Sequence, residues 1–164
     1  MKWFRIILRT LVVLFLQATI FNRLHITNAC HPYMYVLLLI CLPVIPRWGE
    51  LLYGFAVGVL MDIVCSSPGI HTAACVLVAW IRPMFLDHFL QEAERVTDQV
   101  VPASVGNSVF MRLSLWITLL HHLTVFTLDT WSWAHWYWVV LQVLVSGIIT
   151  LGCIYVYGFL FHKS

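Results

Sequence analysis

The stretch Trp136–Phe161, WYWVVLQVLVSGIITLGCIYVYGFLF, contains no Asp, Glu, Lys or Arg. A helix needs roughly 20 mainly apolar residues to cross the hydrocarbon core of a bilayer, so this stretch is long enough to cross it with a tilt. Its apolar residues are continuous, whereas strands of a membrane barrel alternate apolar and polar side chains. Because only helices and closed barrels satisfy their backbone polar groups in lipid, the stretch predicts a transmembrane helix.

The rest of the chain has the same character. Of the 164 residues, 62% are hydrophobic and 10% are charged, whereas about a quarter are charged in soluble domains. The length suits about six spans and leaves no room for a separate soluble catalytic domain. A net charge of +2 without a long basic run argues against binding to nucleic acid.

We therefore expect an all-α integral membrane protein with about six transmembrane helices, forming one helical domain over residues 1–164. The segment 91–108 is the only polar stretch of any length and is expected to be a cytoplasmic loop. Arg82-Pro83 predicts a kink or an early exit from the bilayer near Ile81. The expected spans cover residues 3–22, 32–46, 50–66, 70–90, 109–128 and 136–161.

The distribution of basic residues predicts the orientation, because Lys and Arg are more common in cytoplasmic loops. With six spans and a cytoplasmic N-terminus, eight of the nine Lys and Arg residues fall on one side, and only Arg23 falls on the other. We therefore expect both termini to be cytoplasmic. The eight residues are Lys2, Arg5, Arg9, Arg47, Arg82, Arg95, Arg112 and Lys163.

Gly54, Gly58 and Asp62 are spaced by four residues and therefore share one face of the third expected span. Two small residues at this spacing allow another helix to approach closely, and an ionisable residue within a span usually faces protein or water. The pattern indicates a helix interface. The alternatives are that Asp62 is solvated near the turn at Ser66, or that it relays a proton or an ion.

Three further positions have both a structural and a functional interpretation. Arg82-Pro83 fits a kink with a basic anchor, or a contact with a partner. His71 follows the turn at 66–69 and fits the interfacial start of a helix. His121 and His122 lie well inside the fifth expected span, but adjacent residues point about 100° apart on a helix, so they cannot easily bind one ion.

We expect neither a cofactor nor a metal site. Several histidines and cysteines fall near the outer face, which leaves an outer metal site as an alternative, but H-x-x-x-H and C-x-x-C spacings are absent. They are His25, Cys30, His31, Cys65, His71 and His135. The aromatic run Trp131–Trp138 fits an interfacial belt, with stacking against sugars or a partner as its alternative.

Several small and polar residues follow one another in a recognisable order. They are a basic N-terminus, Pro32-Tyr33, Pro46-Arg47-Trp48, Gly54-x3-Gly58-x3-Asp62, Pro68-Gly69-Ile70-His71 and Arg82-Pro83. This order resembles the rod shape-determining protein MreD family. The resemblance extends over nearly the whole chain and is strongest over residues 46–83.

The resemblance implies a multi-pass protein of the bacterial inner membrane that acts in cell elongation without being an enzyme. It implies a scaffold that supports cell shape and lateral peptidoglycan synthesis through contacts with an MreC-like protein, and indirectly with MreB, RodA and a class B penicillin-binding protein. It also implies a bundle similar to the substrate-binding subunits of energy-coupling-factor transporters. The candidate contact residues are Gly54, Gly58, Asp62, His71, Arg82 and Pro83.

Two other functions remain open at this point. A small-molecule subunit of a vitamin or metal-ion importer would need an outward cavity, formed by Asp62, His71, Asn28 and the Trp131–Trp138 turn. A small intramembrane enzyme would need a catalytic group among Asp62, His71, His121 and His122.

Overall fold

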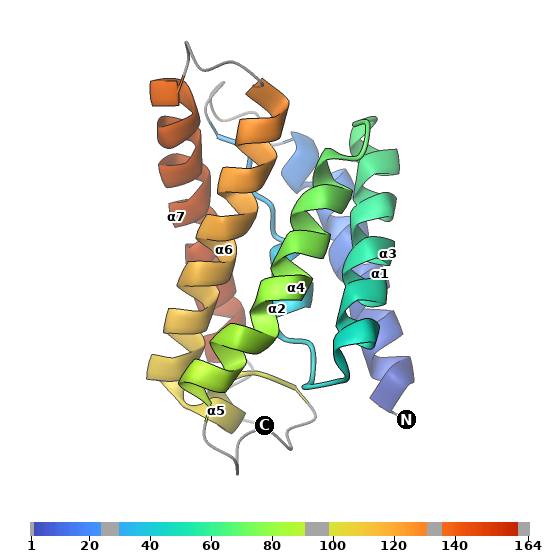
Figure 1. Ribbon diagram of the computed structural model, residues 1–164, viewed down its shortest axis with the longest axis vertical. Coiled ribbons are helices and arrows are strands. Elements are labelled where there is room, and N and C mark those ends of the chain that lie inside the picture. The colour runs from blue at the N-terminus through green and yellow to red at the C-terminus, as the bar shows by residue number, and fades with distance from the viewer. Residues whose placement is uncertain (1, 24–29, 91–98, 131–135, 161–164) are drawn as a thin grey trace.

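The computed structural model describes residues 2–23, 30–90, 99–130 and 136–160 (Figure 1). Within these ranges the chain is almost entirely helical and contains no strand, which confirms the all-α class. Five helices are long and apolar enough to cross a membrane, so the chain is a multi-pass membrane protein. They are α1 (Lys2–Thr19), which η1 (Phe21–Arg23) extends, α3 (Arg47–Cys65), α4 (Ile70–Phe89), α6 (Asn107–Thr130) and α7 (Trp136–Leu160).

The second expected span differs from the prediction. Instead of a long helix over 32–46, only the five residues of α2 (Val36–Ile40) are helical. Prolines at positions 32, 43 and 46 flank α2. A proline cannot donate a backbone hydrogen bond and disfavours a helical residue before it, which explains why the helix is so short.

Residues 30–46, which we term the internal segment, nevertheless run from one end of the bundle to the other (Figure 1). Extended residues advance about 3.3 Å each, so a mostly non-helical segment of this length is long enough for a crossing of about 30 Å. The chain therefore still passes through the bundle between α1 and α3. As a result, the start of α1 and the end of α7 lie at the same end of the molecule.

The internal segment forms the centre of the core. Every residue from Tyr35 to Leu42 is at most 1% exposed. Non-helical backbone is tolerated at membrane depth only where protein or water surrounds it, because lipid cannot satisfy its polar groups. The long helices enclose the segment and separate it from lipid.

One expected boundary is wrong. The segment 91–108 is not a loop throughout, because it contains α5 (Pro102–Val105) and the start of α6; residues 91–98 lie outside the described part. The expected span 70–90 agrees with α4, which continues through Pro83 to Phe89.

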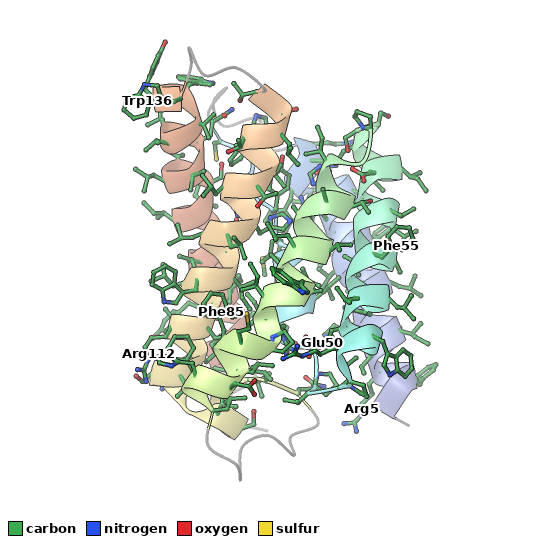
Figure 2. All side chains as sticks on the ribbon, viewed as in Figure 1. Arg5, Glu50, Phe55, Phe85, Arg112 and Trp136 are labelled. Atoms are coloured by element: carbon green, nitrogen blue, oxygen red, sulfur yellow. The ribbon has the colours of Figure 1, made fainter. Side chains whose placement is uncertain are left out.

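The two ends of the bundle differ in chemistry (Figure 2). Arg5 and Arg112 lie at the end where α1 begins, and Trp136 lies at the opposite end. Trp136 and Tyr137 are both more than half exposed, as in an aromatic belt at a membrane surface. Residues 131–135 of the expected belt lie outside the described residues.

Candidate functional site: a polar network around the internal segment

Side chains from two helices form hydrogen bonds with the backbone in the first half of the internal segment. On α1, Gln17 donates from Nε2 to the carbonyl of Pro32 at 3.1 Å and accepts from the amide of Tyr35 at 3.4 Å. On α7, Ser146 Oγ accepts from the amide of His31 at 2.9 Å. Polar side chains thus supply the hydrogen bonds that a helix would have made within its own backbone.

Two arginines donate hydrogen bonds to backbone carbonyls at the end of α2 and just beyond it. Arg82 donates from Nη2 to the carbonyls of Ile40 and Leu42, and Arg9 donates from Nη2 to the carbonyl of Cys41 at 3.1 Å. The last carbonyls of a helix have no partner within it, and a cation near them is stabilising. The two arginines therefore cap α2.

The position of Arg82 corrects its expected role as an anchor at the membrane surface. Its side chain is 1% exposed, and its Nη1 lies 2.6 Å from Oε1 of Glu50, which is equally buried. Breaking such a buried pair leaves an uncompensated charge, so each partner depends on the other. Pro83 beside it lies within α4 and is half-buried.

The glycine face of α3 packs against α4 of the same chain. A Cβ at Gly58 would lie 2.5 Å from Cα of Thr72, and one at Gly54 would lie 2.9 Å from Cβ of Ala79. The two helices approach backbone to backbone, as the small-xxx-small spacing indicates. Our expectation that this face receives a partner protein is wrong, because α4 already covers it.

Asp62 stabilises the start of α4. Its carboxylate accepts from the amides of His71 and Thr72 at 2.9 and 3.0 Å, and from the hydroxyls of Ser67 and Thr72. The first amides of a helix lack partners within it, and a carboxylate there is favourable. At 8% exposure, Asp62 is not simply solvated. It is a capping residue of the α3–α4 turn.

A tyrosine and two histidines form a buried chain of hydrogen bonds. The hydroxyl of Tyr35 lies 2.9 Å from Nδ1 of His71 and 2.6 Å from Nε2 of His121. Nδ1 of His121 is buried without a partner in the part of the chain that the structure describes. The least costly arrangement has His121 donating to Tyr35 and Tyr35 donating to His71, because Nδ1 of His121 then carries no hydrogen.

His122 belongs to a separate chain of bonds. Its Nδ1 lies 2.9 Å from the carbonyl of Thr118, so this nitrogen must donate, and Nε2 then accepts from Thr150 at 3.3 Å. Thr150 in turn accepts from the amide of Tyr33 at 3.2 Å. His122 is therefore a neutral residue that fixes the internal segment to α6 and α7.

A polar cavity of about 400 Å³, which we term the vestibule, lies at the end of the bundle where α3 turns into α4. Tyr33 lines it and packs against two buried histidines. Its ring centroid lies 5.1 Å from that of His71, which also lines the vestibule, and 5.4 Å from that of His122. The vestibule thus offers hydrogen-bonding groups to a small polar molecule. Its polar lining residues are Asn22, His31, Tyr33, Cys65, Ser67, His71 and Asp129.

The structure brings some of the predicted residues together and separates others. His71 joins His121 through Tyr35 and lines the vestibule, whereas Asp62 does not line it. Within the described residues, no group of three His, Cys, Asp or Glu side chains could hold a metal ion. His25, Asn28 and His135 lie outside these residues.

Sequence reasoning missed the residues that hold the internal segment, chiefly Arg9, Gln17 and Tyr35. The available signal was their depth, because polar side chains within a span seldom face lipid. Comparison with known proteins gives no further guide: no family model, curated protein or solved structure matches the chain.

Proposed function

We propose that the chain is a non-enzymatic scaffold of the bacterial cell-elongation complex, located in the inner membrane with both termini in the cytoplasm. The resemblance to the MreD family motivates the identity of the complex. The basic end of the bundle, with Arg5 and Arg112, supports the orientation.

One observation carries the scaffold proposal: buried polar side chains at the internal segment and at the start of α4 form hydrogen bonds with the backbone of the chain itself. Arg82 and Glu50 hold the end of α2, Asp62 holds the start of α4, and Gln17 holds the first half of the internal segment. A bundle fixed internally in this way is a rigid body, and rigidity lowers the ordering cost of binding a partner.

The outer face of α3 is the surface that we assign to the partner. Trp48, Leu52, Phe55 and Ile63 follow one another at helical spacing and are 68%, 60%, 53% and 70% exposed. Phe55 points away from the bundle (Figure 2), while the glycines of the same helix face α4. We therefore expect an MreC-like protein to pack its transmembrane helix along this stripe.

Photo-crosslinking from two matched positions tests the proposal. Benzoylphenylalanine replaces Phe55 on α3 or Leu144 on α7, which are both 53% exposed and both lie in the central part of their helices. The variants are produced in a rod-shaped bacterium together with a tagged MreC-like protein. We expect a crosslinked product from position 55 and little from position 144.

Recovery of the chain alone from position 55, or equal crosslinking from both positions, would contradict the assigned surface. If neither position crosslinks and the MreC-like protein fails to co-purify with the unmodified chain, the scaffold proposal itself is wrong.

The vestibule supports a second candidate, a small-molecule subunit of an importer. It lies at the end opposite the basic residues, and Tyr33 and His71 line it. A thermal-shift panel of water-soluble vitamins and divalent ions tests this candidate. A ligand at 100 times its Kd stabilises the protein by about 2.7 kcal/mol, so a hit should raise the Tm clearly. A flat panel would disfavour the importer.

A further inference from the structure

A second and larger cavity lies along α1 and shares the lining residue Phe21 with the vestibule. Its volume is about 930 Å³, within the range of roughly 300–1,000 Å³ that is usual for ligand sites. Side chains of α1 form one wall, and the other wall comes from Val101, Ala103 and Tyr157. We term this space the lateral groove.

The short internal helix explains why the groove exists. Where a long helix over the second expected span, residues 32–46, would lie beside α1, only α2 and the turn before it are helical or turn, and Met34 and Leu37 line the groove there. α1 is also the least embedded of the five long helices: 17% of its most apolar stretch is buried, against 50% in α6. The groove is therefore lined mainly by apolar side chains along a helix that faces the bilayer.

Two arginines stand at one end of this apolar lining. Arg5 is exposed, and Arg9 donates to two neutral oxygens, the amide oxygen of Gln99 at 3.0 Å and the carbonyl of Cys41. Neutral acceptors do not cancel the charge of a guanidinium. Arg forks bind phosphate groups with favourable geometry.

The groove is at least as long as one leaflet of a bilayer, since its lining continues past Leu16 to Phe21. From Arg5 to Leu16, both of which line it, α1 advances about 16 Å at 1.5 Å per residue. Half of a hydrocarbon core of about 30 Å is about 15 Å. A phosphate held at Arg5 would thus place an acyl chain alongside Leu8 and Val12, with room for it to reach at least the bilayer midplane.

We propose that the lateral groove is an intramolecular binding site for a phospholipid with an anionic headgroup. Arg5 and Arg9 hold the phosphate, and one acyl chain lies between α1 and the α5–α7 side. This lipid completes the bundle where α2 is too short to cross the membrane. The site does not depend on the proposed scaffold function.

Native mass spectrometry on the full chain tests the proposal. The protein is purified in detergent, stripped of lipid, and titrated with phosphatidylglycerol or with phosphatidylcholine of the same acyl chains. We expect the first phosphatidylglycerol to bind at least fivefold more tightly than the first phosphatidylcholine, as one nearby basic residue typically gives.

Two variants locate the site, each with a matched control. Arg5→Gln should weaken phosphatidylglycerol binding about fivefold, whereas Arg47→Gln, an exposed arginine outside the groove, should not. Ala103→Trp should weaken the binding of both lipids, because the tryptophan ring fills the groove. Ala56→Trp places the same ring on the exposed side of α3 and should leave binding unchanged.

Equal binding of the two lipids would overturn the assignment of an anionic headgroup. Equal loss from Arg5→Gln and Arg47→Gln would show a general surface charge effect and not a site. Unchanged binding in Ala103→Trp would overturn the groove itself. Since Arg5, Arg47, Ala56 and Ala103 are all exposed, the four substitutions should leave the fold intact.

Discussion

The α3–α4 pair and the internal segment both provide hydrogen bonds for buried backbone groups, but they do so in opposite ways. In α3 and α4 the backbone groups form hydrogen bonds within their own helix, and Gly54 and Gly58 allow the two helices to come into contact. In the internal segment most backbone groups lie outside a helix, and side chains such as Arg82 and Gln17 bond them. Both regions are buried in a protein whose surroundings offer little water.

The difference teaches what each kind of packing depends on. The helix pair depends on small side chains and close approach, so added volume should damage it. The internal segment depends on individual hydrogen bonds, so loss of a single donor should damage it, even where volume is preserved. Substitutions can test each dependence separately.

The largest effect is expected from Arg82→Met, which keeps an unbranched apolar side chain but removes every hydrogen bond. It leaves the carbonyls of Ile40 and Leu42 without this donor and Glu50 without its counter-ion. Losing one partner of a buried ion pair costs about 3–5 kcal/mol. SDS-induced unfolding in mixed micelles measures the change.

The double variant Arg82→Met/Glu50→Leu shows which role of Arg82 matters more. If Arg82 mainly balances Glu50, removing both charges should restore stability. If it mainly caps α2, as we infer, the double variant should remain well below the parent, because the carbonyls still lack their donor. Full recovery would contradict the capping role.

The next effect concerns the helix pair. Gly58→Ala places a methyl group 2.5 Å from Cα of Thr72, a backbone atom that cannot rotate away. We expect a loss of about 3 kcal/mol, at the upper end for overpacking. Gly147→Ala is the control, because nothing lies within 4 Å of its added Cβ. It should be neutral or slightly stabilising, since alanine favours a helix.

Much of the fold could be predicted because the five long helices are encoded locally. Each is a continuous apolar run long enough for a bilayer, and the Ser66–Gly69 turn ends one and starts another. The small-xxx-small spacing likewise indicated a close helix contact, which requires only residues on one face of one helix.

The internal segment could not be predicted in the same way. Its apolar run Val36–Leu42 has the composition of a membrane helix, and hydropathy cannot tell a helix in lipid from a chain inside protein. The partners of its backbone are far away in sequence: Arg82 lies 40 residues from Leu42. Such pairs depend on the tertiary arrangement, which also explains why Tyr35 was missed as the link between His71 and His121.

A smaller effect is expected from Gln17→Leu. The variant leaves the carbonyl of Pro32 and the amide of Tyr35 without their side-chain partner, and both are fixed backbone groups that cannot turn away. We expect a loss of about 2 kcal/mol in the same unfolding measurement. Gln142→Leu is a close control, since Gln142 is also buried but its Oε1 bonds nothing in the described residues. Equal losses would show that burial of the amide matters and not its bonds.

The smallest effect is expected from Tyr35→Phe. It removes the hydroxyl between His71 and His121, but these partners are side chains that can rotate or change tautomer, unlike the backbone groups bonded by Gln17. Buried side-chain bonds in membrane proteins contribute about 1 kcal/mol, so we expect a loss of that size. Tyr33→Phe should cost less, because the hydroxyl that links His71 to His121 belongs to Tyr35 and not to Tyr33. Nitrogen-15 spectra of the histidine rings should show new tautomer populations at His71 and His121 in the first variant only. If the second variant changes them equally, aromatic packing and not the hydrogen-bond chain fixes the two rings.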